Sequence, residues 1–177
     1  IGRFERRAEA VVERAVRRKA ADLVVFPEYL NVFLLFSKYS DTIARNDTAG
    51  SVLAELARQE HASKRELRRR LTAAVPETYR QVRELWSRIA RRHRVAIVAG
   101  TALAPGAGPG PAAGRGAAAS GTSKAAGGFE VRNRLLLFDS AGRLVYTQDK
   151  VYLTAIERRL LGVSPGSVSD ARVVSLR

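Results

Sequence analysis

The segment that most constrains the fold is residues 23–29, Leu-Val-Val-Phe-Pro-Glu-Tyr, in which an apolar run stops at a proline and a carboxylate follows. The run is apolar throughout, with β-branched and aromatic members, and this pattern predicts a strand over residues 23–26 that is buried on both faces. Pro27 has no N–H for the strand ladder, so we expect the strand to end there. Glu28 would then lie just beyond the carboxyl end of a core strand, where open α/β sheets place their active sites.

A carboxylate at this place supports two interpretations. Partial burial raises the pKa of a carboxyl group, so Glu28 could act as a general base. The other interpretation is a glutamate that is solvated or paired with an arginine, because structural ion pairs also perturb acids. Taken alone, the segment favours the second interpretation.

Three stretches with apolar residues at helical spacing predict helices. The first covers residues 4–20, and the third begins at Pro76, which suits a first helical turn. Between them, Asp47-Thr48 provides N-cap chemistry before a short helix. The apolar residues 31–36 adjoin the carboxylate, and they either line a pocket or pack in the core.

Three further stretches predict strands. Residues 95–99 predict a second buried strand, closed by Gly100-Thr101. Residues 134–138 and 144–147 predict a hairpin around the turn at 139–142. The alternation of helices and strands indicates an α/β fold, and Lys150 comes directly after the hairpin, at another strand end.

Residues 104–128 consist almost entirely of Gly, Ala, Pro and Ser. Such a composition buries little, so we expect a flexible loop or a disordered insertion there. The segments on both sides resemble parts of one sheet, and a chain of 177 residues is about the length of one domain. We therefore treat residues 1–177 as one domain, or part of one, with an insertion.

The chain carries a formal net charge of +14, from 31 Lys and Arg against 17 Asp and Glu. Such an excess is typical of nucleic-acid-binding proteins as well as of highly charged surfaces. No aromatic residues are interleaved with the basic ones to stack on bases, so we expect solvated helix faces. The basic residues fall mainly on predicted helices: Arg14, Arg17, Arg18, Lys19, Lys64, Arg65, Arg68, Arg69, Arg70, Arg88, Arg91, Arg92 and Arg94.

Several classes of protein are disfavoured by composition. No run of 18 apolar residues predicts a membrane span, and no secretory signal opens the chain, so we expect a cytoplasmic protein. The absence of cysteine excludes disulfides and thiolate metal sites in these residues. His61 and His93 lie in different segments without ligand spacing, so a metal site has little support.

Four passages, in this order, resemble the nitrilase superfamily of carbon–nitrogen hydrolases. The passages are residues 24–28, residues 95–101, residues 133–139 with 142–144, and residues 149–154 with Glu157. They resemble the family's catalytic-glutamate motif, its central strand, its Asn-started hairpin, and its lysine motif with the second glutamate.

The resemblance implies an α-β-β-α sandwich that assembles as a dimer or a larger homo-oligomer. It also implies hydrolysis of a small-molecule amide or nitrile, or transfer of its acyl group, by a Glu-Lys-Cys set that needs no metal or organic cofactor. Glu28 would be the general base for the nucleophilic thiol, and Lys150 the cation that stabilises the oxyanion. Glu157 would position the lysine or the substrate.

The chain departs from the family pattern in its nucleophile. The family's cysteine lies on a strand-to-helix elbow after the lysine motif, whereas this chain has no cysteine and lacks the family's first strand. The chain begins at Ile1 rather than Met, and the residues from Arg172 onward resemble the start of a strand. We therefore expect an incomplete sandwich, with the first strand and the nucleophile elbow outside these residues.

Two other functions stay open on the sequence alone. A relative without the nucleophile would be a noncatalytic nitrilase-like binding or regulatory protein. The arginine-rich helices could instead build a basic nucleic-acid-binding module, whose affinity would fall steeply with salt. We rank the hydrolase first, the noncatalytic relative second and the nucleic-acid binder third.

Overall fold

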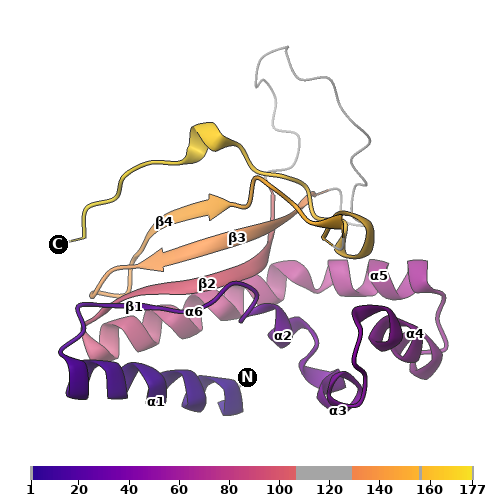
Figure 1. The fold of residues 1–177 in the computed structure, drawn as a ribbon, viewed down its shortest axis with the longest axis horizontal. Coiled ribbons are helices and arrows are strands. Elements are labelled where there is room, and N and C mark those ends of the chain that lie inside the picture. Colours follow the sequence, from indigo (N-terminus) through magenta and orange to yellow (C-terminus); the bar gives the residue numbers. More distant parts are fainter. Residues whose placement is uncertain (1, 107–128, 156, 177) are drawn as a thin grey trace.

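The computed structural model describes residues 2–106, 129–155 and 157–176, and its strands form one sheet in the order β1-β2-β3-β4 (Figure 1). β1 runs parallel to β2, whereas the β2–β3 and β3–β4 pairs are antiparallel. The predicted hairpin is confirmed, and the mixed α/β class with it. The strands are β1 (Leu23–Val25), β2 (Ala96–Pro105), β3 (Val131–Phe138) and β4 (Leu144–Asp149).

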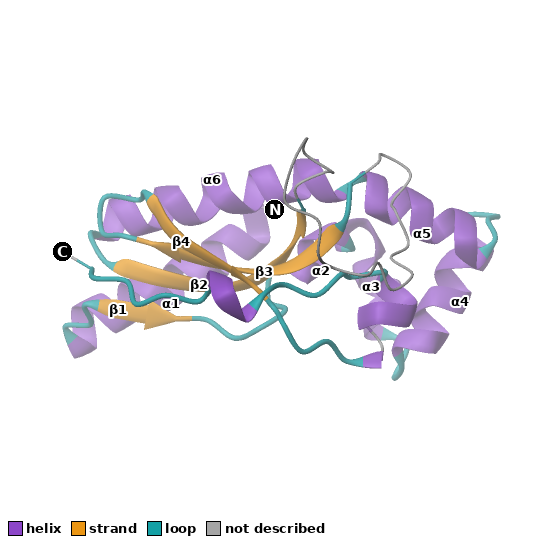
Figure 2. Ribbon diagram, turned by 90° about the horizontal axis from the view of Figure 1, so that it is seen from above, coloured by secondary structure: helices purple, strands orange, loops and turns teal. Residues whose placement is uncertain are grey.

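Two long helices, α1 (Gly2–Lys19) and α6 (Val75–His93), lie side by side against one face of the sheet (Figures 1 and 2). Both were predicted from their apolar stripes, which the structure buries against the strands. Trp86 of α6 lies at the centre of this core, fully buried and in contact with the rings of Phe4 and Phe26. Its indole N–H donates a 2.7 Å hydrogen bond to Asn31 Oδ1, so the core also fixes the chain just after Glu28.

The prediction that residues 23–26 are buried on both faces is wrong. Val24 faces the helices and is buried, but Leu23 and Val25 are 43% and 65% exposed. The reason is the position of β1 at the edge of the sheet, where the described residues cover only the helix-facing side. An apolar sequence of this kind does not show which of its two faces the rest of the chain will cover.

β2 does not end at Gly100-Thr101, as the sequence suggested, but continues to Pro105. The register of its pairing with β3 shifts between Val98 and Thr101, which marks a bulge. Gly100 takes a φ of 70°, and a Cβ atom there would lie 2.1 Å from the carbonyl oxygen of Pro27. Glycine is therefore required where the chain that leaves β1 passes against β2.

Helices α2 (Val32–Leu35), α3 (Ser40–Ala44), α4 (Ala49–Gln59) and α5 (Lys64–Ala73) lie together beyond one end of the sheet (Figure 1). Thr48 caps α4 as predicted, in a reciprocal pair of hydrogen bonds with Ser51, whereas the short helices α2 and α3 were not predicted. Of residues 31–36, Leu34 is buried in the main core and Phe33 is 58% exposed, and none of them lines the two cavities described below.

After β4 the chain turns through a π-helical segment η2 (Glu157–Leu161) and a short 3₁₀ turn η3 (Val168–Asp170). Residues 171–176 form no strand, and Val173 is almost fully exposed, so the strand expected from Arg172 is wrong for the described chain. Of the predicted Gly/Ala-rich insertion, residues 104 and 105 belong to β2, and residues 107–128 lie outside the described residues.

The basic residues of the long helices lie on exposed faces, as predicted, and several pair with acids. Arg88 and Arg92 of α6 contact Glu5 and Glu9 of α1, each at 2.7 Å. Arg80 contacts Glu77 and Glu84 on its own helix. Within the described ranges, no helix is both long and apolar enough to cross a membrane.

Candidate active site

The three predicted site residues, Glu28, Lys150 and Glu157, meet in the structure although they are far apart in the sequence. Lys150 Nζ lies 2.8 Å from Glu28 Oε1 and 3.3 Å from Glu157 Oε2. Glu28 follows β1, Lys150 follows β4, and Glu157 begins η2. The ammonium group therefore lies between two carboxylates.

The backbone carries Glu28 and Lys150 from opposite edges of the sheet to this meeting point. The chain after β1 is held against β2 by a 2.8 Å hydrogen bond from Phe26 N to Val98 O and by a 3.0 Å bond from Tyr29 N to Thr101 Oγ1. On the other side, the Lys150 N–H donates to the Asn133 carbonyl of β3 at 2.8 Å. The predicted positions at strand ends thus bring the side chains together.

Asn133 links the two carboxylates, a role that sequence reasoning did not assign. Its side-chain Nδ2 donates to Glu28 Oε1 at 2.9 Å and to Glu157 Oε1 at 3.0 Å, and the residue is fully buried. The sequence signal was its place at the start of the hairpin motif, on a strand where alternate residues share a face. Only the pairing of β3 with β4 shows that this face carries the site.

Tyr29 is the second residue that the sequence did not single out. Its hydroxyl donates a hydrogen bond to Glu157 Oε1, and Lys150 Nζ lies 5.6 Å from the centre of its ring. Burial and the bond to Glu157 raise the pKa of Tyr29 above its ordinary value, so the phenol stays protonated and donates. The position of Tyr29, directly after Glu28, did not indicate from the sequence that its side chain would contact Glu157.

Glu157 is held as a carboxylate although its side chain is only 2% exposed. Burial by itself would raise its pKa, but hydrogen bonds from Tyr29, the Thr154 backbone and Asn133 outweigh burial and lower the pKa to about 2. The hydrogen bond to Glu28 raises the pKa of Lys150, against the effect of burial, and Glu157 adds to the rise. Both members of the Lys150–Glu157 pair are therefore charged at neutral pH.

A cavity of about 340 Å³ adjoins these groups on the face of the sheet opposite α1 and α6. Its polar lining includes Glu28, Thr101, Gln148 and Lys150, and its apolar lining includes Val25, Phe26, Val98 and Leu135. Glu28 has a side chain that is 44% exposed, so it is the carboxylate that an incoming molecule can reach. A reachable carboxylate beside a fixed ammonium group can exchange a proton and stabilise a developing negative charge.

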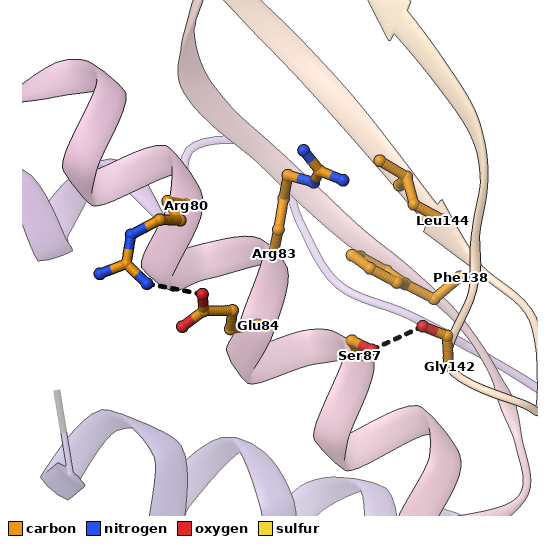
Figure 3. A pocket seen from close by; sticks show the side chains of 7 residues that line it. All are labelled: Arg80, Arg83, Glu84, Ser87, Phe138, Gly142 and Leu144. Carbon is orange, nitrogen blue, oxygen red and sulfur yellow. Dashed lines mark hydrogen bonds and ion pairs between the residues drawn. The ribbon is translucent and has the colours of Figure 1, made fainter.

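A second cavity, of about 290 Å³, lies between α6 and the β3–β4 turn and shares no residue with the first (Figure 3). There Arg80 contacts Glu84 at 2.6 Å, and Ser87 Oγ donates to the Gly142 carbonyl at 2.6 Å. None of the predicted site residues lines it. Among the described residues, no group of three or more His, Cys, Asp or Glu side chains could hold a metal ion.

The chain is similar to known carbon–nitrogen hydrolases in sequence pattern and in fold. The family model for carbon–nitrogen hydrolases matches residues 4–174, whereas a search of curated proteins finds no match. Among solved structures, the carbon–nitrogen hydrolase from Helicobacter pylori G27 superposes with a TM-score of 0.52 at 12% identity. That superposition covers 94% of this chain but only 40% of the other, and at this identity it shows the fold alone.

A glutamate-to-glutamine mutant of the amidase from Nesterenkonia sp. AN1, which shows the result of Michael addition of acrylamide at its active-site cysteine, gives a TM-score of 0.41 at 16% identity. The superposition covers 90% of this chain and 42% of the amidase. The chain thus spans less than half the length of both solved structures. With the family model matching nearly all of its length, the chain belongs to the carbon–nitrogen hydrolase family.

Proposed function

We propose that this chain supplies the general base and the oxyanion-stabilising cation of an enzyme that hydrolyses a small-molecule amide or nitrile. The observation that carries the proposal is the contact of Lys150 Nζ with Glu28 at 2.8 Å and with Glu157 at 3.3 Å, beside an accessible cavity. The chain contains no cysteine, so the nucleophilic thiol of the family mechanism must come from outside these 177 residues.

In the proposed reaction with an amide, Glu28 takes the proton of the thiol, and the thiolate attacks the carbonyl carbon. The negative charge that develops on the carbonyl oxygen is stabilised by the Lys150 ammonium group. The amine leaves with the proton held by Glu28, which produces a thioester. Glu28 then accepts a proton from water as that water attacks the thioester, and the acid is released with the thiol restored.

The surroundings of the two carboxylates support this division of roles. Glu157 is almost fully buried and accepts hydrogen bonds from Tyr29, Asn133 and the Thr154 backbone. Glu28 is 44% exposed, lines the cavity, and has Asn133 and Lys150 as its hydrogen-bond donors. A base must reach its substrate and release its proton, so Glu28 is the better base and Glu157 the better fixed counter-ion.

The test uses the complete protein encoded by the gene that contains residues 1–177. Ammonia release is measured with a panel of amides and nitriles for the wild type, Glu28→Gln and Glu13→Gln. Glu13, on α1, has a 43% exposed side chain and is the matched control. Loss of the base should lower kcat by about 10²–10⁴-fold, and the control should keep wild-type activity.

A second variant, Lys150→Met, removes the cation and should lower kcat by about 10²–10³-fold. If Glu28→Gln is folded by circular dichroism and keeps the activity of Glu13→Gln, the proposal is refuted. If the complete wild-type protein binds amides but hydrolyses none of them, the protein is a noncatalytic nitrilase-like binding protein rather than a hydrolase.

A further inference from the structure

We propose that Tyr29 is a positioning residue that ties Glu157 in place and covers Lys150, so that Glu28 alone is left to exchange protons. The inference rests on the proposed function and extends it to a residue outside the Glu-Lys-Cys set. It is carried by two contacts of one side chain, since the hydroxyl donates to Glu157 and the ring lies 5.6 Å from Lys150 Nζ.

The backbone conformation at Tyr29 directs its side chain toward Glu157. Its φ is 65°, in the left-handed region that bulky residues rarely adopt, and such conformations cluster at functional sites. The N–H of Tyr29 is anchored to Thr101 Oγ1 at 3.0 Å. In extended backbone, neighbouring side chains point to opposite sides, whereas here Glu28 and Tyr29 both reach the group that contains Lys150 and Glu157.

Some hydrogen-bond donors contact both the Glu28 and the Glu157 carboxylate, and others contact only one of them. Asn133 Nδ2 and Lys150 Nζ each contact both Glu28 and Glu157. Among the described residues, the Tyr29 hydroxyl and Thr154, through its N–H at 2.6 Å and its side chain, serve Glu157 and not Glu28. Tyr29 therefore lets Glu157 remain charged without drawing the shared donors away from Glu28.

The other charged groups near Glu157 do not substitute for Tyr29. Lys150 is 3.3 Å away and is shared with Glu28, whose carboxylate is linked to Glu157 through Asn133. Arg158, the next residue on η2, donates instead to the Leu153 carbonyl at 2.9 Å. Removing the Tyr29 hydroxyl should therefore change the pKa of Glu157 directly.

The experiment titrates the glutamate carboxyls of the complete protein by carbon-13 NMR in the wild type, Tyr29→Phe and Tyr152→Phe. Tyr29→Phe removes the hydroxyl and keeps the ring, and Tyr152, which is 84% exposed, is the matched control. The midpoint of Glu157 should rise by about one pH unit in Tyr29→Phe, a roughly tenfold change in proton affinity. Tyr152→Phe should leave it unchanged.

A second measurement at pH 7 avoids acid unfolding. The side-chain amide signals of Asn133 should move in Tyr29→Phe and stay in place in Tyr152→Phe, because Asn133 and Tyr29 share Glu157 Oε1. Tyr29→Leu also removes the ring, so it should additionally lower the midpoint of Lys150. If Tyr29→Phe leaves both the Glu157 midpoint and the Asn133 signals at their wild-type values, the inference is wrong.

In the complete enzyme, Tyr29→Phe should lower kcat with little change in KM, and it should shift the acid limb of the pH–rate profile to higher pH. A normal kcat and profile in Tyr29→Phe, with Glu28→Gln inactive, would overturn the inference and leave the hydrolase intact. Full activity in both variants would overturn the proposed function itself. The two failures are therefore distinguishable.

Discussion

Replacing Glu157 by glutamine should change how the stability of the chain depends on pH. In the folded protein its pKa is lowered from 4.5 to about 2. Because each pKa unit corresponds to about 1.4 kcal/mol, the ionised carboxylate contributes about 3 kcal/mol to the free energy of unfolding. A depressed pKa means that this stabilisation is fully present above pH 4.5 and is lost as the pH falls through the folded value.

The assay is urea unfolding of the wild type and Glu157→Gln at pH 7, 5, 4 and 3, followed by the fluorescence of the buried Trp86. Glutamine cannot titrate, so the advantage of the wild type should be largest at pH 7 and 5 and should shrink below that. Extrapolated to pH 2, the two free energies should have converged by about 3 kcal/mol relative to pH 7. Titrating groups that do not interact with Glu157 act equally on both proteins and cancel in the difference.

Glu13→Gln on α1 is the control, because this exposed acid has its ion-pair partner, Arg17, on the same helix and lies away from the site. Its stability at pH 7 should stay within about 0.5 kcal/mol of the wild type, because an exposed i,i+4 ion pair contributes about 0.3–0.5 kcal/mol. A difference between the wild type and Glu157→Gln that stays constant from pH 7 to pH 3 would refute the reasoning. It would mean that the hydrogen bonds to Glu157 do not favour its ionised form.

Three further outcomes are expected. Gly100→Ala should lower the free energy of unfolding in urea by at least about 2 kcal/mol, since the new Cβ would lie 2.1 Å from Pro27 O at a φ of 70°. A stability equal to that of the wild type would contradict the close approach of the Pro27 backbone to β2. Asp149→Asn should cost about 1–3 kcal/mol, because Asp149 accepts two hydrogen bonds from Arg134, at 2.5 and 2.9 Å, and the loss should vanish in an Arg134→Met background. The 177-residue chain alone should show no amidase turnover above background, and turnover that Glu28→Gln abolishes would show that its nucleophile lies within these residues.

Sequence reasoning worked where a local pattern and a tertiary position coincide. The stripes of α1 and α6 are periodic because one side of each helix packs on the sheet, so their existence follows from the sequence. Glu28 and Lys150 were proposed because each follows a recognisable strand, and the structure brings their side chains to 2.8 Å from each other. The resemblance of four ordered motifs supplied the role of each residue.

The features that the sequence did not predict depend on how the strands pair and on which faces of the sheet are covered. Local sequence patterns do not determine either. Val25 has the same apolar neighbours whether its face is covered or open. Gly100 reads as a strand end in the sequence, yet it marks a bulge inside β2. The contacts of Asn133 and Tyr29 with Glu157 depend on the register of β3 and on a left-handed backbone at an aromatic residue, and the local sequence predicts neither.

The distance along the chain between Glu28 and Lys150 has a consequence for synthesis on the ribosome. The two residues are 122 positions apart, and their contact requires the parallel pairing of β1 with β2 and the whole β3–β4 hairpin. At roughly 5–20 residues per second, Lys150 is made about 6–24 s after Glu28. For that interval the nascent chain carries Glu28 without Lys150, and the contact between them can form only after β4 has been made.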